Sequence, residues 1–157
     1  MCSPHTRNSI LGIRDNAREF SYKVKKNPIE LDEEMMNEFL DNINLLKKLL
    51  IEQTDKINEV IHNIEQITWI DPKEIDEECL KDINDIISTL KDLHSSLIRQ
   101  FVQLNPIRKK GIAKSECKAY KGAMDDIKDS YADLESVFFY LPEMPGFVET
   151  TKQLSLI

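Results

Sequence analysis

One stretch, residues 32–69, constrains the fold of this chain more than any other. Its apolar residues recur at alternating steps of three and four, and Gln53 alone interrupts the pattern. They are Met36, Phe39, Ile43, Leu46, Leu50, Ile57, Val60, Ile64 and Ile67. This spacing is typical of an α-helix that packs along one seam. It predicts one continuous helix, roughly 55 Å long at 1.5 Å per residue, with Asp32 as its N-cap and the other helices packed on it.

Three further segments show the same helical rhythm and predict three more helices. The stripe of the first helix, from about Asn8 to Lys26, is Ile10, Ile13, Ala17, Phe20 and Val24. The stripe of the third is Cys79, Ile83, Ile86, Leu90, Leu93, Leu97, Phe101 and Leu104. The stripe of the fourth is Cys117, Tyr120, Met124, Ile127, Tyr131, Leu134, Phe138 and Leu141. All six prolines, which would break a helix, fall outside the interiors of these predicted helices. The positions of the prolines therefore agree with the apolar periodicity.

Capping residues suggest where the later helices begin. Asp71 followed by Pro72, with Glu74 at the capping-box position, predicts the start of the third helix. The start of the fourth helix is left open between two positions. Pro106 and Ser115 both carry a helix-start signal, and Gly111 lies between them.

Together these segments predict an all-α fold, an antiparallel up-down helical bundle with three long helices and a shorter N-terminal helix. Short connections favour antiparallel neighbours, and only four glycines argue against a turn-rich β fold. We expect a single domain over residues 1–157, with a loose N-terminal tail at 1–7 and a C-terminal tail at 146–157. A three-helix core with the first helix loosely docked is the alternative.

In the lengths and order of its predicted helices, the segment 32–141 resembles the three-helix N-terminal regulatory domain of syntaxins. The resemblance is one of architecture and rests on heptads and segment lengths. It implies a helical regulatory or binding domain and transfers no functional residue to this chain. The SNARE helix and the membrane anchor that follow this domain in syntaxins are not found in the sequence.

Composition narrows the classes of partner. The formal net charge of −7 argues against nucleic-acid binding and favours a basic protein partner.

No run approaches 18 apolar residues, so we predict no membrane insertion. Cys2, Cys79 and Cys117 are odd in number and form no C-x-x-C pair, which suits a reducing compartment. With no apolar signal segment at the N-terminus, the predicted location is the cytoplasm.

No catalytic, metal or cofactor signature emerges from the spacing of reactive residues. Glu59 and His62 form one E-x-x-H pair, as in di-iron bundles. The second pair is missing, because Lys91 stands where His94 would need a glutamate. There is also no glycine loop for phosphate and no nucleophile elbow. We therefore predict no enzyme activity, no metal and no cofactor.

Antiparallel packing predicts one aromatic pole, where the second and fourth helices end and the third begins. Aromatic residues rimmed by acids suit a protein-binding surface. The candidate partner-binding residues are Trp69, Ile70, Asp71, Glu74, Phe138, Phe139, Tyr140 and Phe147. The alternative is that the C-terminal tail buries them.

The sequence therefore favours a non-enzymatic protein–protein interaction module, such as an adaptor, scaffold subunit or inhibitor, with an acidic helical surface and an aromatic pole. Its expected partner is another protein, basic or helical, and a homo-oligomer stays open. One alternative is an antitoxin or immunity-type inhibitor of a basic protein. Another is a small enzyme or ligand carrier with a site inside the bundle, for which His94, Tyr120 and Tyr131 are the candidates.

Overall fold

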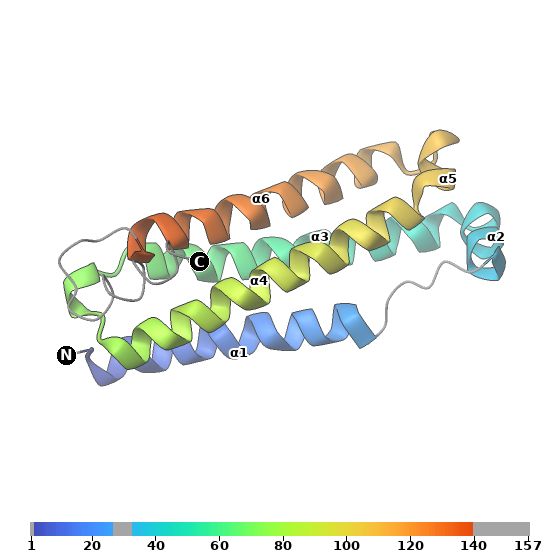
Figure 1. Ribbon diagram of the computed structural model, residues 1–157. Helices are drawn as coiled ribbons and strands as arrows, with labels where there is room; N and C mark the ends of the chain where they lie inside the picture. Colours follow the sequence, from blue (N-terminus) through green and yellow to red (C-terminus); the bar gives the residue numbers. More distant parts are fainter. Residues whose placement is uncertain (1, 27–32, 140–157) are drawn as a thin grey trace, which may run out of the picture.

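The computed structural model describes residues 2–26 and 33–139 of the chain, and this part contains helices and no β-strand. The elements are α1 (Pro4–Lys26), α2 (Glu33–Asp41), α3 (Ile43–Thr68), the 3₁₀ turn η1 (Pro72–Glu74), α4 (Glu77–Gln103), α5 (Asn105–Lys109) and α6 (Lys114–Phe139). The four long helices lie side by side and alternate in direction along the chain (Figure 1). The predicted all-α up-down bundle is confirmed.

The order of helices around the bundle differs from their order in the chain. α1 packs on α4, α4 on α6, α6 on α3, and α3 on α1. The two most extensive interfaces, α1/α4 and α3/α6, each join helices that run in the same direction (Figure 1). The loosely docked first helix is wrong, because the apolar stripe of α1 is buried against the rest of the bundle.

The predicted stripes form one continuous core. Residues with no exposed surface come from each of the four long helices: Ile10, Ala17, Leu46, Leu50, Ile57, Ile67, Cys79, Ile83, Ile86, Leu90, Leu93, Leu97, Tyr120, Ile127, Leu134 and Phe138. Tyr131 is only partly buried, and Leu141 lies outside the described residues. Burial of the helical faces against one another supplies most of the stability of such a bundle.

The continuous helix predicted over 32–69 is wrong, because the chain leaves the helical conformation at Asn42. This residue has φ −133° and ψ 85°, and its side chain makes no capping hydrogen bond. Asparagine is a weak helix former, so a break costs less here than at the leucines that follow. α2 turns away from α3 at the break (Figure 1). Ile43 consequently leaves the seam and is 41% exposed.

The first helix begins at Pro4 rather than at Asn8, so the predicted loose tail over residues 1–7 is wrong from Pro4 onward. Ser3 acts as the N-cap: its hydroxyl accepts a hydrogen bond of 3.2 Å from the backbone N–H of Thr6. Pro4 occupies the first helical position, where its missing N–H has no intrahelical partner to lose.

The third predicted helix starts later than expected. The Asp71 carboxylate does cap a turn, but it caps η1, accepting a hydrogen bond from the Lys73 N–H at 3.1 Å. The chain then becomes extended at Ile75, which is buried. Asp76 caps α4 itself, accepting from the Cys79 N–H at 2.9 Å. The extended, buried Ile75 thus separates η1 from α4. The predicted start of this helix at Pro72 is therefore wrong.

Both predicted starts of the fourth helix are used in part. The five-residue helix α5 includes Pro106, and α6 begins at Lys114, next to Ser115. Between them, Gly111 and Ala113 take positive φ values of 73° and 53°. The left-handed conformation at two positions reverses the chain and prevents a continuous helix.

Truncation of Leu90 should cost about 2–5 kcal/mol of unfolding free energy. Its side chain is fully buried in the middle of α4, where the stripes of the long helices meet. Val102→Ala on the same helix is the matched control, because that side chain is 58% exposed. Urea unfolding of both variants would measure the difference, and equal stabilities would place Leu90 on the wrong face.

Candidate functional site: an acidic groove between α3 and α6

The seam between α1 and α4 is closed by ion pairs that cross from one helix to the other. Arginine and lysine side chains of α1 meet carboxylates of α4 in four pairs: Arg7–Glu78, Arg14–Asp82 at 2.9 Å, Arg18–Asp85 at 3.1 Å, and Lys25–Asp92. Residue numbers rise together on both helices, as a parallel pair requires. Four carboxylates of α4 are therefore paired with cations within the chain.

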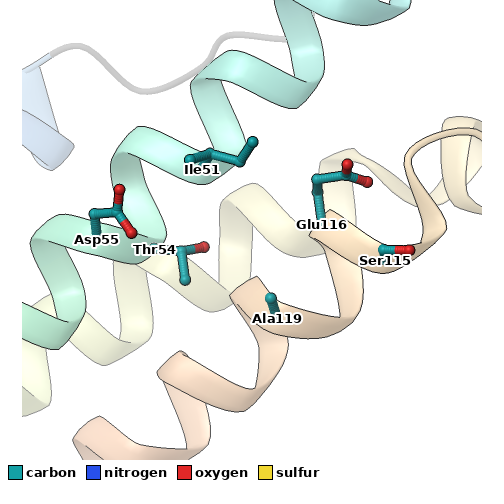
Figure 2. Close-up of a pocket in the computed structure, with 6 residues that line it drawn as sticks. All are labelled: Ile51, Thr54, Asp55, Ser115, Glu116 and Ala119. Atoms are coloured by element: carbon teal, nitrogen blue, oxygen red, sulfur yellow. The ribbon is translucent and has the colours of Figure 1, made fainter.

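The seam between α3 and α6 is the second parallel pair, and it contains two hollows. The first, of about 340 Å³, is lined by Ile51, Thr54, Asp55, Ser115, Glu116 and Ala119. Figure 2 shows that the first three come from α3 and the last three from α6. The second, of about 290 Å³, is lined by Ile61, Ile64, Glu65, Thr68, Asp126, Asp129, Ser130 and Asp133. We call these two hollows together the α3/α6 groove.

The α3/α6 groove is acidic and contains no lysine or arginine among its described lining residues. Its carboxylates are Asp55, Glu65, Glu116, Asp126, Asp129 and Asp133. None of them forms an ion pair within the described part of the chain. Carboxylates from both helices thus line the groove without the ion pairs that those of the α1/α4 seam form.

Apolar side chains and one unsatisfied hydroxyl complete the α3/α6 groove. Ile64 is buried, Ile61 is partly buried, and Ile51 is 49% exposed. The hydroxyl oxygen of Thr54 is buried and has no hydrogen-bond partner. Buried polar atoms are rarely left unpaired in folded proteins. The groove therefore combines apolar surface with negative charge.

The predicted aromatic pole is partly exposed. Trp69 is 78% exposed, Ile70 packs partly against the core, and Asp71 and Glu74 are exposed. Phe138 is fully buried as the last core residue of α6, so it adds nothing to the exposed surface of this pole. The Phe139 side chain and residues Tyr140 and Phe147 lie outside what the structure describes. Since Thr68 lines the second hollow, Trp69 directly follows the end of the α3/α6 groove.

Of the three residues proposed for a site inside the bundle, His94 and Tyr131 come together and Tyr120 lies apart from them. The His94 ring packs edge-on against Tyr131, with centroids 6.2 Å apart. Tyr120 is buried elsewhere on the α4/α6 seam, where its hydroxyl donates to Gln100 at 3.3 Å. Burial raises the pKa of the Tyr120 hydroxyl above its usual range. None of the three lines the α3/α6 groove.

Potential metal ligands are dispersed. His62 is exposed, and Glu59 forms an ion pair with Lys56 at 3.1 Å instead of facing the bundle interior. Among residues 2–26 and 33–139, no cluster of three or more histidine, cysteine or acidic residues could hold a metal ion. Likewise, no described helix is both long enough and apolar enough to cross a membrane.

Comparison of the chain with protein-family models, curated proteins and solved structures gave no match. The resemblance to the syntaxin domain therefore carries no functional conclusion. Any function must be argued from the geometry of this molecule.

Sequence reasoning did not identify the α3/α6 groove, although one signal was available. Asp126, Asp129 and Asp133 recur at helical steps of three and four, which places them on one face of α6. What the sequence does not reveal is that α6 packs on α3. Without that neighbour, an acidic stripe is indistinguishable from an ordinary solvated helix face.

The pKa of His94 is lowered from its usual 6.5, mainly by burial and also by the charge of Lys128, while Asp125 opposes the shift. The unfolded chain then binds a proton that the folded chain resists, so stability should fall as pH drops through about 6.5. His94→Gln should show a flatter dependence of Tm between about pH 8 and pH 5.5. Parallel Tm curves for variant and parent would contradict this assignment.

The ion pairs of the α1/α4 seam should differ in strength. Arg14 and Asp82 have side chains only 21% and 17% exposed, whereas Arg18 and Asp85 are about half exposed. A double-mutant cycle with Arg14→Gln and Asp82→Asn should give a coupling energy of about 1–2 kcal/mol. This value lies between those typical of exposed and of buried ion pairs. The same cycle on Arg18 and Asp85 is the control and should give below about 1 kcal/mol. A larger coupling in the control pair would show that burial does not set the ranking.

Proposed function

We propose that this chain is a non-enzymatic protein-binding module whose α3/α6 groove receives a basic amphipathic helix of a partner protein. The observation that carries the proposal is the contrast between the two parallel seams. In the α1/α4 seam the carboxylates have cationic partners within the chain. In the α3/α6 groove six carboxylates flank apolar side chains and have no cationic partner among residues 2–26 and 33–139.

The contact between α1 and α4 indicates the chemistry that such a partner needs. α1 presents Arg14 and Arg18 beside its buried residues Ile13 and Ala17, so cations and apolar groups alternate along one side of the helix. A partner helix with lysine or arginine flanking a leucine or isoleucine stripe would meet the α3/α6 groove in the same manner. This is the helix-in-groove mode of recognition.

Charge and apolar contact would have separate roles in binding. The negative rim would attract a basic helix and increase the association rate, more strongly at low salt. Ile51 and Ile61, together with Trp69 beyond the end of the groove, offer apolar and aromatic surface for the contact itself. Aromatic side chains of this kind often contribute most to interface energy. An inhibitor of a basic protein would use the same surface in the same way.

A designed peptide provides a direct test of the groove. We expect a helical peptide of about 20 residues, with a leucine stripe flanked by lysines, to bind with an affinity that falls as salt rises. A peptide of the same composition in scrambled order is its control. Trp69 is the single tryptophan of the chain, so its fluorescence reports binding near the end of the groove when the peptide contains none.

Two triple variants with the same net charge distinguish binding in the groove from a general effect of the protein's negative charge. The triple change Asp126→Asn, Asp129→Asn and Asp133→Asn should weaken peptide binding about tenfold, because each rim contact is worth about 0.2–1 kcal/mol. The control changes Glu34→Gln, Glu38→Gln and Asp41→Asn remove three exposed charges from α2. α2 lies at the end of the bundle where α6 begins, whereas the three aspartates lie in the middle and C-terminal part of α6 (Figure 1). Equal losses in both variants, or none in either, would overturn the proposal.

A further inference from the structure

Two cysteines that are far apart in the sequence lie at the same end of the bundle. Cys2 directly precedes the N-cap of α1, and Cys79 belongs to the first turn of α4. Because α1 and α4 run parallel, their N-termini lie next to each other (Figure 1). The ion pair between Arg7 and Glu78 fixes this register close to both cysteines.

The side chains of Cys2 and Cys79 lie close to each other. Cys2 packs partly buried against the core cluster to which Cys79 belongs, and the two thiols interact with each other. The Asp76 carboxylate accepts a hydrogen bond of 2.9 Å from the backbone N–H of Cys79 and also lies close to the Cys2 backbone. The N-cap of α4 is therefore next to both cysteines.

We propose that Cys2 and Cys79 form an oxidisable thiol pair, which a peroxide converts to a disulfide that ties α1 to α4. The balanced reaction consumes two thiols and one hydrogen peroxide and gives one disulfide and two waters. The Cys2 sulfur first attacks one peroxide oxygen, the O–O bond breaks, and a sulfenic acid and one water form. The Cys79 sulfur then attacks the Cys2 sulfur, the S–O bond breaks, and the thiol proton leaves with the second water.

Burial assigns the order of the two steps. Cys2 is the more accessible of the pair, so it meets the oxidant first. Cys79 is fully buried, and burial, together with the neighbouring Cys2 thiol, raises the pKa of its own thiol to about 12. Cys79 therefore reacts with the oxidant less readily than Cys2. Cys117 takes no part, because it lies in the first turn of α6, at the other end of the bundle.

The proposed disulfide would connect the two helices of the most extensive interface. It closes the whole chain between residues 2 and 79 into a loop, which lowers the conformational entropy of the unfolded state. α1, otherwise held on α4 by packing and ion pairs, would then be fastened covalently at its N-terminus. Oxidation would therefore act as a modification that stabilises the assembled four-helix arrangement.

The test is mass spectrometry of the full reduced chain after treatment with hydrogen peroxide. We expect the intact mass to fall by about 2 Da, and peptide mapping to join the segments that contain Cys2 and Cys79. Cys117→Ser should retain the 2 Da loss, and its Tm should rise by several degrees on oxidation. Cys2→Ser should lose both effects while its reduced form melts like the parent, because the side chain is only partly buried.

Three results would overturn the proposal. The mass could rise through oxygen addition with no disulfide formed, the peptide map could join chains to each other, or Cys2→Ser could still lose 2 Da. A disulfide that left Tm unchanged or lowered it would overturn the stabilising role. Cys79→Ala adds a second check, since it should also abolish the bond in whatever fraction of that variant folds.

Discussion

The contact between α1 and α4 determines how the rest of the bundle is arranged. Apolar stripes alone would allow several helix orders, because every stripe has the same heptad rhythm. Complementary charges favour the observed order, since the cations of α1 pair with carboxylates of α4 along the parallel register. Once α1 occupies this side of α4, the other side is left for α6. α3 then completes the square between α6 and α1.

A buried polar contact reinforces this arrangement where α1 ends. Gln100 of α4 is only 3% exposed; its amide nitrogen donates to the Val24 carbonyl at 3.4 Å, and its amide oxygen accepts from the Tyr120 hydroxyl. Val24 lies in the last turn of α1, where carbonyl groups have no intrahelical partner. One side chain thus links three helices. A shifted register would leave these polar groups buried and unpaired, at a cost of about 1–3 kcal/mol each.

Periodicity predicted which faces are buried, but it could not predict where helices break or which ones touch. Phe39 and Leu46, which lie on either side of Asn42, are both buried. The apolar stripe therefore gives no sign that the helix breaks between them. The sequence predicts Asp71 as a cap. The burial of Ile75, which moves the start of α4 to Glu77, depends on tertiary packing. The pairing of α3 with α6 was equally hidden, because the α3/α6 groove exists only once two distant segments meet. Local signals therefore predicted which segments are helical, whereas long-range packing determined where the helices break and where the groove forms.

The carboxylates that line the α3/α6 groove repel one another, and this repulsion opposes the packing of α3 on α6. Glu65 on α3 and the three aspartates on α6 line one hollow, so like charges face each other across a seam that only apolar packing closes. Mutual repulsion makes this seam less stable than a seam with matched charges. A cationic helix in the groove would remove that repulsion and cover the exposed apolar side chains at the same time. Binding and stability would then be coupled, because a partner that binds only the folded groove stabilises the fold. A local arrangement that weakens the isolated protein is expected where a surface serves a partner rather than the fold.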